Sequence, residues 1–197
     1  LEKDVRKLRK RLNRLSGGVQ SALSNAVHSV LTLNQELASE TILGDLPINR
    51  RFHRLDHRCH VFIARHLPSS RHLRFVSGVL RVITMLERVG DYAETISRAS
   101  LQLTEPPPAR IAQDMEMLLR HVSKNLEQSM RAFLEEDEDL ARGTLSSAKQ
   151  YLPTFDKVYT DLVKEGEDKT RPVIELFSLL AIFNRLAVIT RPAGETN

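Results

Sequence analysis

Apolar residues recur along the chain at intervals of three and four positions, which is the spacing of one face of an α-helix. The first run covers residues 2–39, where the pair Gly17-Gly18 lowers the helix propensity without ending the pattern. Its apolar positions are Leu8, Leu12, Leu15, Val19, Leu23, Val27, Val30, Leu31 and Leu37. The pattern therefore predicts one long amphipathic helix over residues 2–39.

Glycine and proline divide the rest of the first half into two further helices. The segment Gly44-Asp45-Leu46-Pro47 interrupts the periodicity and predicts the start of a second helix that runs to about residue 66. Pro68, followed by two serines, suits the beginning of a third helix. The run Glu105-Pro106-Pro107-Pro108 ends it, because three prolines cannot continue a helix.

A second set of three helices is predicted after this proline run. The fourth carries apolar positions from Met115 to Leu134, the fifth covers about 139–164 with a bend or break at Pro153, and the sixth covers about 172–189. The prediction is an all-α fold of six helices in two tandem antiparallel three-helix bundles. Residues 1–105 form the first unit, and residues 109–197 form a second, degenerate one.

Composition agrees with a globular helical protein. Of the 197 residues, 41% are hydrophobic and 27% charged, while aromatic residues make up 5% and Trp is absent, which favours helix over sheet. The single cysteine, Cys59, excludes an internal disulfide framework and points to a reducing cytoplasm. No apolar run approaches the span of a bilayer, and no secretory signal is visible. Because the chain begins with Leu1, it is open whether it is a fragment of a larger protein.

Two carboxylates of the third predicted helix, Glu87 and Asp91, stand one turn apart on one face. Like charges this close disfavour joint ionisation unless a cation shares them, and carboxylate oxygens suit a hard or borderline metal. With Glu94 on the adjoining turn and Glu36 or Glu40 from the first predicted helix, they form a candidate metal site. The alternative is a solvated acidic strip beside the core.

A longer pattern surrounds these carboxylates. It consists of Pro68, Leu73, Arg74, Glu87, Arg88, Gly90, Asp91, Ala93 and Ile96. This spacing resembles the third helix of a repeat in the PhoU family of bacterial phosphate-signalling regulators, whose pattern is Pro, a short loop, Asp-Leu-Arg, an apolar helix and Glu-Arg-apolar-Gly-Asp-x-Ala-x-Asn-Ile. Two positions differ, since His72 stands where the family usually has Asp and Thr95 where it usually has Asn.

The resemblance implies a cytoplasmic regulator of phosphate homeostasis with the same tandem bundles. Such a protein negatively regulates the phosphate-starvation response and phosphate uptake by docking to the ATPase subunit of a phosphate ABC transporter and to a sensor histidine kinase. The resemblance further implies a homodimer, membrane association through these partners, and a divalent or iron-type metal at the acidic motif. Aligning the sixth predicted helix on the third places Asn184 at Glu87 and Val188 at Asp91, so only one acidic motif is retained.

Two other clusters carry candidate chemistry. On the second predicted helix, imidazoles and a carboxylate share one face, which suits Zn, Ni or Cu, although three nearby arginines favour an ordinary polar face. These residues are His53, Asp56, His57 and His60. On the third helix, a row of arginines is a candidate for docking to acidic partners or oxyanions, the alternative being internal ion pairs. The row comprises Arg71, Arg74, Arg81 and Arg88.

The positive charge of the chain does not by itself indicate nucleic-acid binding. The net charge is +4 and the pI about 9.4, and much of the positive charge lies between Lys3 and Arg14 without interleaved aromatics. No nucleic-acid-binding motif follows it, so this end suits an acidic partner or an anionic membrane surface.

No catalytic motif is recognisable, so the sequence predicts a non-enzyme. The alternatives to a phosphate regulator are a metal-binding protein for storage or tolerance, a basic nucleic-acid binder, and an excised cytoplasmic domain of a sodium–phosphate cotransporter.

Overall fold

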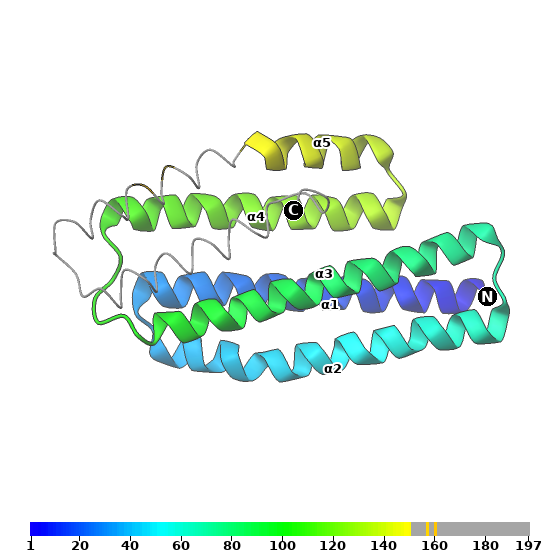
Figure 1. The fold of residues 1–197 in the computed structure, drawn as a ribbon, viewed down its shortest axis with the longest axis horizontal. Coiled ribbons are helices and arrows are strands. Elements are labelled where there is room, and N and C mark those ends of the chain that lie inside the picture. The colour runs from blue at the N-terminus through cyan, green and yellow to red at the C-terminus, as the bar shows by residue number, and fades with distance from the viewer. Residues whose placement is uncertain (151–156, 158–159, 161–197) are drawn as a thin grey trace.

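The computed structural model describes residues 1–150, 157 and 160, and within them every regular element is a helix. The helices are α1 (Glu2–Thr32), α2 (Gln35–His66), α3 (Ser70–Ser100), α4 (Ala109–Glu135) and α5 (Glu138–Gln150) (Figure 1). None of these helices is both long enough and apolar enough to cross a membrane. The all-α prediction is confirmed for this part of the chain.

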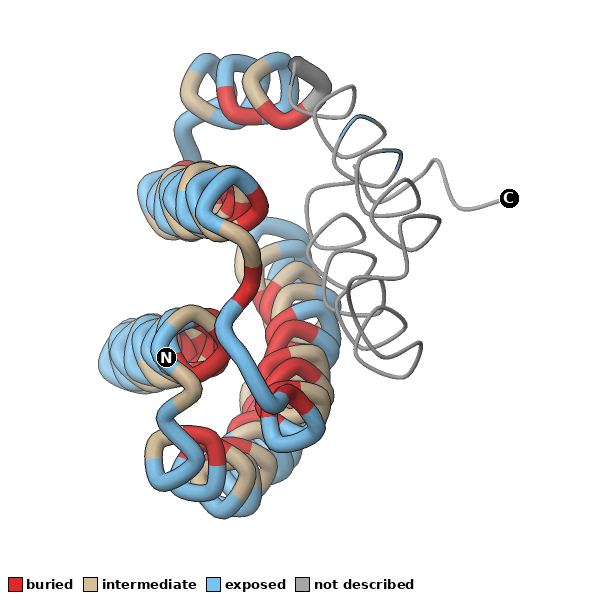
Figure 2. Tube along the Cα trace, turned by 90° about the vertical axis from the view of Figure 1, so that its left-hand side faces the viewer, coloured by how far each residue is buried: buried red, intermediate tan, exposed pale blue. Residues whose placement is uncertain are grey.

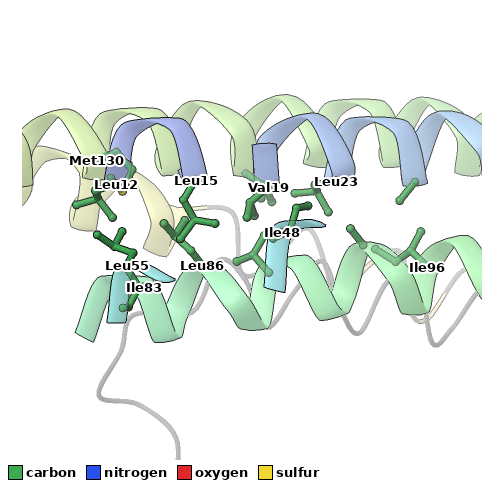
Figure 3. Packing of buried hydrophobic residues seen from close by; sticks show 14 of the residues in the cluster. Leu12, Leu15, Val19, Leu23, Ile48, Leu55, Ile83, Leu86, Ile96 and Met130 are labelled. Carbon is green, nitrogen blue, oxygen red and sulfur yellow. The ribbon is translucent and has the colours of Figure 1, made fainter. Parts of the chain in front are cut away.

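Helices α1, α2 and α3 pack together as a three-helix bundle, with α4 alongside α1 and α5 against α4 (Figure 1). The predicted apolar stripe of α1 is the centre of this bundle, and its buried positions face those of α2 and α3 (Figure 2). Leu12 and Leu15 of α1 lie close to Leu55 of α2 and to Ile83 and Leu86 of α3 (Figure 3).

The end of the first helix differs from the prediction. Helix α1 stops at Thr32 rather than at residue 39, because Leu33 adopts a left-handed conformation with φ 51°. The amide of Asn34 donates to the carbonyl of Ser29 at 3.1 Å, and the Asn34 side chain accepts from the Leu37 amide at 2.9 Å. Asn34 therefore caps a second helix within what the sequence pattern presents as one.

The prediction of a helix break at residues 44–47 was wrong, because Gly44 and Pro47 both lie inside α2. Pro47 removes one backbone donor, which leaves the carbonyl four residues earlier without its helical partner. Leu43 and Pro47 are exposed, so water can reach this carbonyl, while neighbouring Ile48 is buried in the core. Packing of α2 on α1 and α3 thus overrides the local preference for a break.

The other predicted helices follow the sequence more closely. Helix α3 begins directly after Pro68 and Ser69 and ends at Ser100, before the proline run, and α4 begins at Ala109 directly after it. Helix α5 begins at Glu138, close to its predicted start. Its predicted continuation past Pro153, the sixth helix, and the positions Asn184 and Val188 all lie outside the described residues. The division into units at 105 and 109 stays a prediction.

Candidate functional site

The acidic motif lies on the side of α3 that faces α2, close to the crossing of the two helices. Gly90 is buried there, and a Cβ atom at this position would lie 3.7 Å from Oδ1 of Asp45 on α2. Since Glu87 and Asp91 are on the adjoining turns of α3, the crossing brings a carboxylate of α2 to the predicted pair. The candidate site, called the acidic cluster below, therefore consists of Asp45, Glu87, Asp91 and Glu94.

Asp45 is the most constrained member of the acidic cluster. The amide Nδ2 of Asn49 donates to Asp45 Oδ2 at 2.6 Å, whereas Oδ1 is buried and has no hydrogen-bond partner among the described residues. Burial, followed by the negative charges of Glu94 and Asp91, raises the pKa of Asp45 above its usual value. Oδ1 of Asp45 is thus a buried oxygen without a hydrogen-bond partner among the described residues, on a side chain that is itself half-buried.

The carboxylates on α3 are coupled to one another. Burial first, and then the charge of Asp91, raises the pKa of Glu87, and the nearby His53 opposes this shift. Burial and the charge of Glu94 raise the pKa of Asp91. Glu94 differs because Arg98 donates to its Oε1 at 2.6 and 2.9 Å. The acidic cluster therefore holds excess negative charge that one arginine balances in part.

These donors alone do not form a complete ligand set. Across the described residues, no three His, Cys, Asp or Glu side chains are arranged to hold a metal ion. Glu36 and Glu40 lie on α2 and are exposed, rather than on the first helix as predicted. Asp45 is the α2 carboxylate that reaches the acidic cluster. The sequence prediction missed it because residues 44–47 were interpreted as a break between helices.

The predicted histidine cluster of α2 occupies a polar surface. His53, His57 and His60 are all exposed, and His60 Nδ1 lies 3.5 Å from Asp56 Oδ2 within the same helix. The ring of His53 packs edge-on against Phe52, with 5.1 Å between the ring centroids. This arrangement agrees with the interpretation of an ordinary polar helix face.

The arginine row of α3 is exposed over its whole length. Arg71 pairs with Glu136 at 3.5 Å. Within the described residues, Arg71, Arg74 and Arg81 border a largely apolar groove of about 960 Å³ between α3, α4 and α5, whereas Arg88 lies apart from it. The four arginines therefore do not converge on a single site.

Comparison with known proteins finds similarity to the PhoU family. Residues 12–100 match the family model of the PhoU domain. The chain is 28% identical over 165 residues to the phosphate-specific transport system accessory protein PhoU homolog of Aquifex aeolicus, covering 84% of this chain and 73% of that protein. It is 28% identical over 162 residues to the accessory protein PhoU of Serratia marcescens, covering 82% and 65%, and 25% identical over 177 residues to that of Escherichia coli, covering 90% and 73%. The chain thus spans about two thirds to three quarters of the length of these relatives.

Solved structures share the same fold. The structure of PhoU from Pseudomonas aeruginosa superposes with a TM-score of 0.84 at 24% identity, covering 96% of this chain and 91% of that one. The phosphate transport system regulatory protein PhoU from Streptococcus pneumoniae gives a TM-score of 0.87 at 21% identity, covering 96% and 89%. Residues 12–100 match the PhoU domain model, and together with these relatives the match supports the family resemblance drawn from the sequence pattern.

Proposed function

We propose that this PhoU-family chain is an accessory protein of a phosphate-specific transport system. In this role it restrains phosphate uptake and the phosphate-starvation response when phosphate is plentiful. The observation that carries the proposal is the segment Glu87–Asp91, which stands inside a PhoU domain with Asp45 of the neighbouring helix placed against its glycine. Relatives over most of the chain bear the name of such accessory proteins.

The mechanism we propose is docking in the cytoplasm, with membrane association through the partners. The partners are the ATPase subunit of a phosphate ABC transporter and a sensor histidine kinase. A protein that binds one state of a partner more tightly than another shifts the partner toward that state, without any chemical step. The proposal is therefore that of a regulator and not of an enzyme.

The exposed side of α2 near residue 45 suits protein contact. Leu43 and Leu46, which are close to Asp45 in the sequence of α2, are 75% and 57% exposed. Exposed large apolar side chains are common at protein interfaces. We place either a partner or a second copy of the chain on this surface. Light scattering after gel filtration tests the homodimer.

A cation at the acidic cluster is part of the same proposal. Glu87 and Asp91 offer carboxylate oxygens, which are the donor type that a divalent or iron-type metal takes. Since no three such groups of the described residues are arranged around one point, water would supply the remaining ligands, with the unpartnered Oδ1 of Asp45 nearby. When bound, the cation neutralises the cluster and stiffens the contact between α2 and α3.

A tagged chain recovered from native membranes at high and at low phosphate tests the regulatory role. We expect mass spectrometry to identify a phosphate-transporter ATPase or a histidine kinase, in amounts that depend on phosphate supply. The variant Glu87→Gln with Asp91→Asn is expected to recover less of either partner. The matched control is Glu116→Gln with Glu135→Gln on α4, where each glutamate instead pairs with an arginine four residues away.

The result also separates the alternative functions. Recovery of the chain alone with stoichiometric metal supports metal storage or tolerance, and salt-dependent DNA binding supports a nucleic-acid binder. For the cation, Glu87→Ala with Asp91→Ala is expected to lower metal content while helix content by circular dichroism stays the same. An unchanged metal content contradicts the proposed ligands.

A further inference from the structure

Helices α1 and α2 run antiparallel in a constant register. Near one end, Asp4 Oδ2 lies 3.2 Å from His66 Nε2. Further along, a Cβ atom at Gly18 would lie 3.2 Å from the guanidinium of Arg51. These two pairs are separated by about 21 Å of helix. The residues between them face each other across one continuous seam.

A small cleft opens in this seam, and its walls are mainly cationic. It has a volume of about 140 Å³, and its cationic lining residues are Lys7 and Arg11 from α1 and Arg58 and Arg65 from α2. The spacing places each pair on one face of its helix, toward the partner helix. Buried Leu8 and Phe62 form the apolar base of the cleft.

The cations of the cleft are poorly balanced by acidic groups. Asp4 is the one carboxylate among the described lining residues, and it already lies 3.1 Å from Lys7 and 3.2 Å from His66. Within the described residues, none of Arg11, Arg58 and Arg65 forms an ion pair. Burial, and then the charges of Arg58 and Arg14, lowers the pKa of Arg11, as expected for cations held together without a counter-charge.

We propose that this cleft binds a phosphoryl group between Arg11 and Arg58. A planar guanidinium donates two parallel hydrogen bonds to the oxygens of such a group, and two guanidiniums from opposite walls complement its double negative charge. A water molecule takes up about 30 Å³, so the cleft holds one oxyanion with a few waters, whereas pockets for larger ligands exceed about 300 Å³. Inorganic phosphate and the headgroup of an anionic lipid both present this chemistry.

The cleft is distinct from the acidic cluster and does not rest on the proposed regulatory role. Its lining residues come from α1 and the C-terminal half of α2, whereas the acidic cluster uses α3 and residue 45 of α2. Binding of the oxyanion is measured on the purified chain without a transporter or kinase. The oxyanion site can therefore fail while the regulatory role holds, and the reverse, because the two experiments are independent.

The first experiment titrates inorganic phosphate into the purified chain at constant ionic strength. Arginine Nε–Hε signals are followed by NMR, and saturable shifts of the Arg11 and Arg58 signals are expected. The variant Arg11→Gln with Arg58→Gln should bind at least about tenfold more weakly, because two charge-assisted contacts are lost. The control Arg131→Gln with Arg142→Gln removes the same charge from arginines that pair with glutamates on their own helices, and should bind as the unaltered chain does.

A second arm identifies the source of the phosphoryl group. Sedimentation is measured with vesicles of phosphatidylcholine, with and without phosphatidic acid. Phosphate binding that is lost in the Arg11/Arg58 variant supports a free-ion site, and vesicle binding alone that is lost in this variant supports a lipid headgroup. Absence of saturable binding to both probes, or equal binding by the Arg11/Arg58 and Arg131/Arg142 variants, overturns the proposal. Circular dichroism verifies that each variant is folded, and Arg11→Lys with Arg58→Lys is expected to retain partial binding.

Discussion

Asp45 and Gly90 meet where α2 crosses α3, with Asp45 Oδ1 3.7 Å from the position that a Cβ atom of Gly90 would occupy. Ile48 Cγ2 lies at the same distance, so α2 packs directly over this glycine. The crossing of the two helices over Gly90 brings a carboxylate from α2 to the acidic face of α3. It turns a pair of carboxylates into a cluster.

Replacing Asp91 by Asn is expected to stabilise the metal-free protein at neutral pH. Asp91 is near Glu87 and Glu94 on its own helix, and each like-charge pair of this kind costs about 0.2–0.5 kcal/mol. Burial and Glu94 raise the pKa of Asp91. The folded state therefore binds a proton more readily than the unfolded state, so the penalty is present at neutral pH and is lost as the pH falls through the folded-state pKa.

Urea denaturation with a chelator present measures this effect. The gain in unfolding free energy from Asp91→Asn should be present at neutral pH and clearly smaller near pH 4, which is about the ordinary carboxylate pKa. The control Glu116→Gln removes a carboxylate that lies 3.8 Å from Arg120, and it should give no gain. A gain of equal size at both pH values contradicts the electrostatic explanation.

Three helical glycines are expected to respond differently to alanine. Gly17→Ala meets no neighbouring atom within 4 Å and should stabilise by up to about 1 kcal/mol through helix propensity. Gly90→Ala makes only ordinary contacts at 3.7 Å and should be close to this. In Gly78→Ala the new Cβ lies 2.7 Å from the ring of Phe133, which stacks on Phe75, so the ring must move and the gain is lost.

Thermal unfolding of the three alanine variants checks this order. The midpoint should be highest for Gly17→Ala and lowest for Gly78→Ala. A second substitution, Phe133→Leu, removes the ring that the new Cβ meets. In this background Gly78→Ala should lower the unfolding midpoint less than it does in the unaltered chain. A Gly78→Ala variant as stable as Gly17→Ala contradicts the packing argument.

Some helix boundaries can be predicted from the sequence pattern and others cannot. The start of α3 was predictable because proline and serine directly precede its apolar stripe. The break at Leu33 was not, because a left-handed leucine is uncommon and the apolar periodicity continues to Leu37. Asn34 was the available signal, since asparagine is a favoured N-cap.

The acidic cluster was predictable only in part. The spacing of Glu87 and Asp91 predicted that both carboxylates lie on one face of α3, because positions four apart in one helix are neighbours. The position of Asp45 depended on α2 continuing through Pro47 and on packing against Gly90, and neither follows from spacing along one helix. The cleft between Arg11 and Arg58 likewise depends on the register between two helices.

Cys59 is expected to be chemically inert in the folded protein. Its side chain is fully buried in the core, and burial, followed by the charge of Asp56, raises the pKa of its thiol to about 12. The thiolate is the reactive species, so iodoacetamide at mildly alkaline pH should label Cys59 only after denaturation. Mass spectrometry with and without urea measures this, and fast labelling of the folded chain contradicts the buried position.

Arg9 is expected to hold α1 against the C-terminal end of α4. Its guanidinium donates to Glu136 Oε1 at 2.8 Å and to the carbonyl of Leu134, and it lies 4.4 Å from the centroid of the Phe75 ring. Arg9→Ala should therefore cost about 1–2 kcal/mol in urea denaturation, and Arg9→Lys less, because lysine keeps the charge but not the forked donors. Since the hydrogen bond from Arg9 lowers the pKa of Glu136, the part of this stabilisation that comes from Glu136 should be lost as the pH falls through that pKa. An Arg9→Ala variant whose stability matches the unaltered chain at neutral pH contradicts this role.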